Sequence, residues 1–214
     1  MLTRALAIGL ATGAYGLSFG ALAVAAGLSL AQAVAMSAFV FTGATQLSVV
    51  GALAAGGAAA PAVASGLVLA SRHVAYGVAV APVLPGTLRA RLLAAHLVID
   101  ESTAMARAQP DPRRARVAFW ATGASVFAFW NAATIAGALI GSAIADPAAL
   151  GLDAVFPAAF VALLAPQLAT GPARRAALAG AAIAVALVPV APAGVPVLAA
   201  IAATLVAAPA ARRP

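Results

Sequence analysis

The sequence predicts an all-α, polytopic helical membrane protein with about seven transmembrane or re-entrant helices, some of them broken near the centre. The first observation is composition: 64% of the 214 residues are hydrophobic and only 8% are charged, whereas about a quarter of a soluble domain is charged. The second is length, because the apolar runs come close to the roughly 20 residues that cross a bilayer as a helix. We therefore expect residues 1–214 to form a single integral membrane domain.

Composition also excludes several kinds of chemistry. The chain has no cysteine, which excludes disulfides, zinc–thiolate sites and thiol catalysis. Its two histidines have no third ligand at helical spacing, and the motifs of serine hydrolases, zinc proteases and P-loop enzymes do not occur. We therefore expect no metal, no cofactor and no catalytic residue. The net charge of +7 comes from arginines that mostly flank apolar runs, which favours membrane anchoring over nucleic-acid binding.

The first apolar run, Ala5–Ala26, is long enough to span a membrane. Its glycines recur at four-residue spacing, at Gly9 and Gly13 and at Gly16 and Gly20. Small residues at this spacing indicate close packing against another helix. The alternative is a helix loosened over residues 16–20, which would place Ser18 on a substrate path.

The second run, Leu28–Ala55, is too long and too interrupted for one simple span. A polar cluster lies within it, consisting of Thr42, Gly43, Thr45 and Gln46. Irregular backbone is tolerated at membrane depth where it lines a cavity, so we expect a re-entrant pair of half-helices. The alternative is a continuous helix whose threonines bond back to their own carbonyls.

The third run, Pro61–Val83, carries a second polar cluster of Ser71, Arg72, His73 and Tyr76. Arg72 and Tyr76 are four residues apart and therefore share one face of a helix. The segment Arg89–Arg107 is only partly apolar and holds two adjacent acids, which predicts a short membrane-dipping or broken helix. Residues 109–116 carry two prolines and three arginines, and we expect a loop there.

The second half of the chain begins with its clearest span, Val117–Ser142, in which Asn131 and Thr134 form a polar patch. Residues 171–175 are expected to form a loop. Further apolar runs are expected at residues 154–170, 176–189 and 195–208.

The arginines predict the orientation of the chain. Three clusters are separated from each other by two predicted spans: Arg113, Arg114 and Arg116; Arg174 and Arg175; Arg212 and Arg213. The positive-inside rule places all three in the cytoplasm, together with the C-terminus. Arg4 and Arg89 join that face only if residues 28–55 enter the membrane and return; an external N-terminus with three plain spans is the alternative.

Arg72 lies about halfway along a predicted span, where an unpaired charge costs about 2.5 kcal/mol or more. Asp100 and Glu101 are the carboxylates in plausibly buried sequence, so we expect them near Arg72 and His73. Such an arrangement serves either substrate binding or a structural ion pair. His73 and His96 suggest either a proton relay or hydrogen-bonding links between helices.

These motifs, in this order, resemble the AzlC-type family over about Tyr15–Gln167. The motifs are Gly16–Gly20 with Ala26–Gly27, Phe41–Gln46, Arg72-His73 with Tyr76-Gly77, Asp100–Ser102, and Gly151–Phe160. The resemblance implies the large subunit of a bacterial inner-membrane exporter of leucine, isoleucine, valine and sometimes methionine. It also implies a small AzlD-like membrane subunit as partner and the proton motive force as energy source.

The residues suggest how a zwitterion with a branched apolar tail would be held. Arg72 or half-helix N-termini near residues 42–46 would bind the carboxylate, and Asp100 or Glu101 the ammonium group or a coupled proton. The candidate substrate-binding residues are Ser18, Phe41, Thr42, Gly43, Thr45, Gln46, Arg72, His73, Tyr76, Asp100, Glu101 and Asn131. The alternatives are a membrane scaffold or assembly protein without a substrate, or a transporter of another small amino acid.

Overall fold

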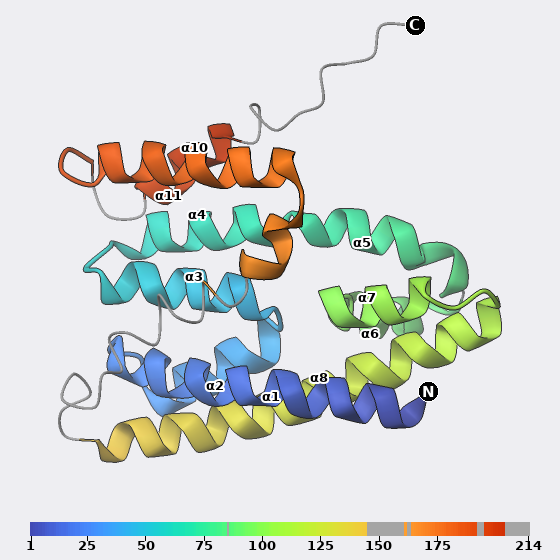
Figure 1. Ribbon diagram of the computed structural model, residues 1–214. Coiled ribbons are helices and arrows are strands. Elements are labelled where there is room, and N and C mark those ends of the chain that lie inside the picture. Colours follow the sequence, from blue (N-terminus) through green and yellow to red (C-terminus); the bar gives the residue numbers. More distant parts are fainter. Residues whose placement is uncertain (85, 145–160, 162–163, 192–194, 204–214) are drawn as a thin grey trace, which may run out of the picture.

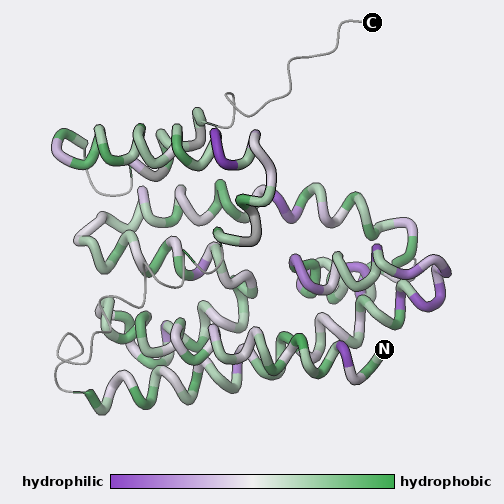
Figure 2. Tube along the Cα trace, in the orientation of Figure 1, coloured by the Kyte–Doolittle hydropathy of each residue, from purple (hydrophilic) through white to green (hydrophobic). Residues whose placement is uncertain are grey.

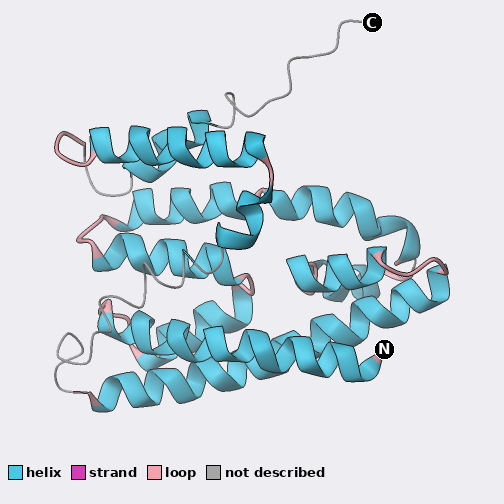
Figure 3. Cartoon of the chain, in the orientation of Figure 1, coloured by secondary structure: helices cyan, strands magenta, loops and turns pink. Residues whose placement is uncertain are grey.

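The computed structural model describes residues 1–84, 86–144, 161, 164–191 and 195–203, and every regular element in these ranges is helical. Figure 3 shows helices joined by short loops. Three helical stretches are long and apolar enough to cross a membrane: α1 (Leu2–Ala25), the segment Ala59–Val83, and α8 (Pro112–Ala143). The predicted all-α membrane class is confirmed.

Among the described helices, α1 and α8 make the most extensive contact, and glycines allow their approach. A Cβ added at Gly16 would lie 2.8 Å from the Trp130 carbonyl oxygen, and one at Gly141 would lie 2.9 Å from Ala21 Cα. Additions at Gly20 and Gly137 would collide with the opposite backbone. The predicted packing role of the four-residue spacing is confirmed. The alternative is contradicted, because α1 is unbroken through residues 16–20.

Residues 28–55 form two short helices, α2 (Leu30–Phe39) and α3 (Gly43–Ala54), with a break between them. Ser29 and Gln32 form a capping box at the start of α2. At 1.5 Å per residue the two helices are about 15 and 18 Å long, roughly half of a 30 Å hydrocarbon core. Figure 1 shows them as a hairpin that starts where α1 ends, reaches the middle of the molecule and returns. The continuous-helix alternative is contradicted.

A second hairpin approaches from the opposite end. Helices α4 (Ala59–Ala70), α5 (Arg72–Val80) and η1 (Ala81–Val83) cross the molecule. The chain then turns into α6 (Leu88–His96) and α7 (Asp100–Arg107). The helix predicted over residues 89–107 is thus broken, and its tip at residues 97–100 faces the tip of the first hairpin (Figure 1).

Figure 2 shows many hydrophilic residues at the end of the molecule that carries the N-terminus, and others nearer its middle, at the starts of α5 and α10. The starts of α1, α6 and α8 all lie at this end (Figure 1). The starts of α1 and α6 can lie at the same end because the α2–α3 hairpin does not cross the molecule: it returns to the end at which α1 finishes. The structure thus has the folded-back pair of half-helices that we expected for residues 28–55; which sides of a membrane the segments reach stays a prediction.

Two predicted loops begin helices instead. α8 starts at Pro112, with the Asp111 side chain accepting a hydrogen bond from Arg114 N at 2.9 Å. α10 (Gly171–Leu187) starts within residues 171–175, capped by Thr170. In both cases a proline occupies the first helical turn, where its missing N–H removes no hydrogen bond. Proline marked a helix start where we expected a loop.

The C-terminal part contributes η4 (Ala165–Ala169), α10, α11 (Val195–Ala199) and η5 (Ala200–Ala203). α11 contacts both α10 and α4. The motif at 151–160, Arg212 and Arg213 lie outside the described residues, as do parts of the runs predicted at 154–170 and 195–208. The cytoplasmic C-terminus stays a prediction.

Candidate functional site

A central cavity of about 590 Å³ lies where the two hairpin tips meet. Five parts of the chain line it: α1, the α2–α3 break with the start of α3, α5, the α6–α7 tip, and α8. The lining residues are Thr12, Tyr15, Phe41, Thr42, Gly43, Ala44, Leu47, Arg72, Tyr76, Ile99, Asp100, Glu101, Val126 and Trp130. Seven of the twelve candidate residues from the sequence are among them: Phe41, Thr42, Gly43, Arg72, Tyr76, Asp100 and Glu101.

Asp100 links two helices through both of its carboxylate oxygens. Arg72 Nη2 donates to Oδ2 at 3.0 Å, and the Tyr76 hydroxyl donates to Oδ1 at 2.6 Å. The proximity of Arg72 and Asp100 that we predicted from the cost of a buried charge is confirmed. Because the pair is neutral as a whole, Arg72 adds little net positive charge to the cavity.

Glu101, the next residue, lines the same cavity without an ion-pair partner among the described residues. It lies in the short helix α7, outside the three span-length stretches. Burial raises the pKa of the Glu101 carboxyl above its ordinary value. A hydrogen bond from its own backbone N–H lowers the pKa, the negative charge of Asp100 raises it further, and the positive charge of Arg72 lowers it, each by less than burial raises it. Glu101 is therefore the carboxylate of this cavity that is free to bind a cation or a proton.

The N-terminus of α3 opens onto the cavity. Thr42 is its N-cap residue, with extended backbone, but its side chain does not cap the helix. Its hydroxyl instead shares a hydrogen bond with the Thr45 hydroxyl at 3.3 Å. The first-turn N–H groups of a helix lack intrahelical acceptors and carry partial positive charge. Such a terminus is suited to binding a carboxylate.

Trp130 is a cavity residue that our sequence reasoning missed. Its indole is buried, stacks on Phe19 with ring centroids 6.2 Å apart, and leaves Nε1 without a hydrogen-bond partner among the described residues. A Cβ added at Gly43 would lie 2.8 Å from Trp130 Cη2. Glycine at this position therefore lets α3 begin directly against the indole. The available signal was a tryptophan in the middle of a span, away from both interfaces.

The other five candidates lie outside the cavity lining. Gln46 is fully buried and its Nε2 donates to the Met36 carbonyl at 3.0 Å, which joins α3 to α2. Thr45 is buried beside Thr42. Asn131 Nδ2 donates to the Phe127 carbonyl at 2.8 Å, four residues earlier in α8. These contacts indicate that the side chains of Gln46 and Asn131 serve to hold backbone carbonyl groups of α2 and α8 in place.

Ser18 lies half-buried on α1. His73 Nδ1 lies 2.9 Å from the Ala70 carbonyl oxygen, and its ring meets Tyr76 edge-on. His96 is exposed and packs against Phe41 and Phe127. Whether the histidines relay protons stays a prediction.

The AzlC protein family matches the chain over residues 7–144. The chain belongs to the AzlC family. This is a family of branched-chain amino-acid transport proteins, and it is not enzymatic. The matched range contains every residue that lines the central cavity, whereas the 151–160 motif lies beyond it. No curated protein and no solved structure matches this AzlC chain.

Proposed function

We propose that this AzlC-family chain is the large subunit of a bacterial inner-membrane exporter of leucine, isoleucine, valine and methionine. We propose also that it works with a small AzlD-like membrane subunit and is driven by the proton motive force. The observation that carries the proposal is the central cavity, which combines a free carboxylate, an open helix N-terminus and an apolar wall. Its volume of about 590 Å³ lies within the usual range for small-molecule sites.

The cavity lining offers groups that complement both charges of a zwitterion. The N-terminus of α3 binds the substrate carboxylate through its backbone N–H groups, and Glu101 binds the ammonium group. Phe41, Leu47 and Val126 contact the branched side chain, with Trp130 closing the wall behind it. Arg72 is engaged by Asp100, so we assign the Arg72–Asp100–Tyr76 cluster to holding α5 and α7 together.

Glu101 also supplies a reason for coupling to protons. Burial raises the pKa of the Glu101 carboxyl, so the carboxyl holds a proton more readily than an exposed glutamate does. The proton and the substrate ammonium compete for this one group, so each leaves when the other binds. Competition of this kind exchanges an inward proton for an outward amino acid.

The test is efflux from bacterial cells that lack their own branched-chain exporters. Cells fed a valine-containing dipeptide accumulate valine by hydrolysis, and its appearance outside is measured with and without this chain and its small partner. We expect faster efflux and a lower internal valine concentration only when both chains are present, and slower efflux when an uncoupler removes the proton gradient. Unchanged efflux with both chains in the membrane would overturn the proposal.

A further inference from the structure

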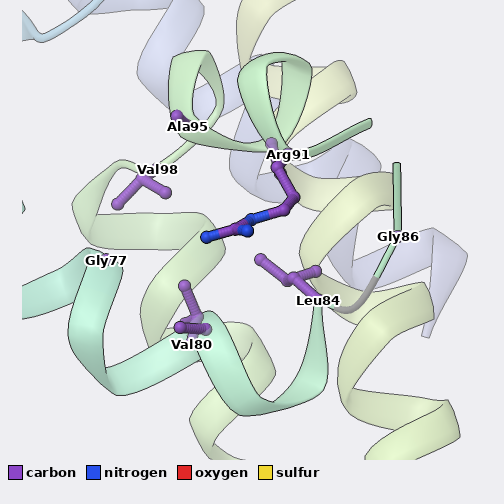
Figure 4. A pocket seen from close by; sticks show the side chains of 9 residues that line it. Gly77, Val80, Leu84, Gly86, Arg91, Ala95 and Val98 are labelled. Carbon is purple, nitrogen blue, oxygen red and sulfur yellow. The ribbon is translucent and has the colours of Figure 1, made fainter. Parts of the chain in front are cut away.

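A second cavity, of about 440 Å³, lies between α5–η1 and the α6 helix of the second hairpin. Its wall is apolar apart from Arg91, and we call it the Arg91 cavity. Figure 4 shows the Arg91 side chain reaching across it, with its guanidinium group near Gly77, Val80 and Val98. Arg91 has no carboxylate partner in the described part of the chain, where the ion pair is Arg72–Asp100.

The two cavities are neighbours along the chain. Gly77 and Val98 line the Arg91 cavity, whereas Tyr76 and Ile99, each adjacent in sequence, line the central cavity. The Tyr76–Asp100 hydrogen bond of 2.6 Å joins α5 to α7 at this boundary. The link consists of side chains, so it can open without unfolding either helix.

The position of the Arg91 cavity suggests what reaches it. It lies towards the arginine-rich end of the molecule (Figures 1 and 2), which the positive-inside rule places in the cytoplasm. A guanidinium group binds a carboxylate through parallel hydrogen bonds, and a cationic group in an apolar concavity attracts anions strongly. Leu84, Val80 and Val98 offer an apolar surface beside it.

We propose that the Arg91 cavity is a cytoplasmic vestibule in which Arg91 binds the carboxylate of the amino acid before it passes the Tyr76–Asp100 boundary. This inference rests on the proposed export function and deepens it. Arg91 thereby acts on substrate capture, whereas the α3 N-terminus and Glu101 act in the central cavity.

The absence of native cysteine allows a test that does not depend on transport. Ala95 lines the Arg91 cavity, and we would replace it by Cys in the complex with the small subunit, in inside-out membrane vesicles. Labelling is then measured with an anionic and a cationic methanethiosulfonate reagent of similar size. We expect the ratio of anionic to cationic rates to fall about tenfold in Arg91→Gln. Arg89→Gln, on the same helix but outside the cavity lining, is the matched control and should keep the ratio.

Occupancy is tested in the same vesicles. We expect L-valine to slow labelling of Ala95→Cys, and Arg91→Gln to raise the KM for valine from the cytoplasmic side with little change in kcat. An equal labelling ratio with and without Arg91 would overturn the inference. The inference would also be overturned if valine failed to slow labelling in vesicles that transport valine. Protection by phosphatidylglycerol, and not by valine, would overturn it as well, because the cavity would then be a lipid site. Absence of valine transport by the unmodified complex would overturn the proposed function instead, whatever the labelling rates.

Discussion

At the residue scale, the adjacent acids Asp100 and Glu101 differ in their surroundings. Asp100 is held by Arg72 and Tyr76. Removing either charge of the Arg72–Asp100 pair leaves the other uncompensated, which is costlier than losing both. We expect Arg72→Gln and Asp100→Asn each to destabilise the purified protein by about 1–3 kcal/mol, and the double variant by less than their sum.

Thermal unfolding in detergent measures these three variants against the unmodified chain. Ser71→Ala is the matched control, because the Ser71 side chain is exposed and its hydroxyl donates to the Val68 carbonyl in the preceding helix, α4. Additive effects of the two charge changes would contradict the coupling of Arg72 with Asp100.

The ionised Glu101 carboxylate is expected to lower the stability of the protein and to strengthen substrate binding. Its raised pKa means that folding favours the protonated carboxyl, so its favourable contribution is complete below the ordinary pKa of about 4.3. That contribution is lost as the pH rises through the raised value. We therefore expect Glu101→Gln to be more stable than the unmodified chain at pH 8, with the difference shrinking towards pH 4.

The same variant should bind valine more weakly, because the carboxylate that contacts the ammonium group is gone. Melting temperature against pH, with valine binding at each pH, measures both effects. A Glu101→Gln protein with unchanged valine affinity would remove Glu101 from the site.

Some of these side-chain positions could be predicted from the sequence and others could not. An unpaired charge at membrane depth is costly, so Arg72 was expected to pair with a carboxylate. The chain has only five acidic residues, which left few possible partners. No comparable cost of an unpaired charge determined where the side chains of Gln46 and Trp130 would lie. The partner of Gln46 is the Met36 carbonyl, and this contact depends on how α3 folds back against α2, which residue spacing alone does not reveal.

At the element scale, the start of α3 depends on Gly43 facing Trp130. An alanine Cβ would lie 2.8 Å from Cη2 of the indole, so either the ring or the helix start must move. Overpacking of this kind typically costs about 1–3 kcal/mol. We expect Gly43→Ala to lower valine affinity, and Gly43→Ala with Trp130→Phe to recover part of it by making room.

Isothermal titration with valine on the purified complex measures the effect. Gly171→Ala is a suitable control, since a Cβ there has no neighbour within 4 Å. A double variant weaker than Gly43→Ala alone would contradict steric displacement as the cause.

The elements themselves followed from the sequence to different degrees. Four-residue glycine spacing predicted that α1 packs closely against another helix, because only small residues allow two backbones to approach so closely; that the partner is α8 comes from the structure. Polar and glycine interruptions predicted the broken α2–α3 segment. The starts of α8 and α10 were misplaced, because proline suits both a loop and the first turn of a helix.

At the scale of the whole molecule, the two hairpins give the chain an inverted arrangement. α1 is followed by the α2–α3 hairpin, and the α4–α5 crossing by the α6–α7 hairpin, which enters from the opposite end (Figure 1). Inverted repeats with broken helices at the midplane are common in transporters that alternate access between two sides. The sequence predicted both broken segments, from the polar interruptions of residues 28–55 and the adjacent acids of residues 89–107. It did not predict that the two hairpins approach from opposite ends and meet at their tips.

This arrangement makes a topological prediction that separates it from three plain spans. With α2–α3 re-entrant, the end of α1 and the start of α4 lie on the same side of the membrane; with plain spans they lie on opposite sides. The cysteine-free chain allows single cysteines at exposed positions: Ala25→Cys, Ala58→Cys and, beyond α7, Ala108→Cys. A membrane-impermeant maleimide added to intact cells should label Ala25→Cys and Ala58→Cys, whereas Ala108→Cys should react only after permeabilisation. Opposite accessibility of positions 25 and 58 would contradict the hairpin, and with it the meeting of the two tips at the central cavity.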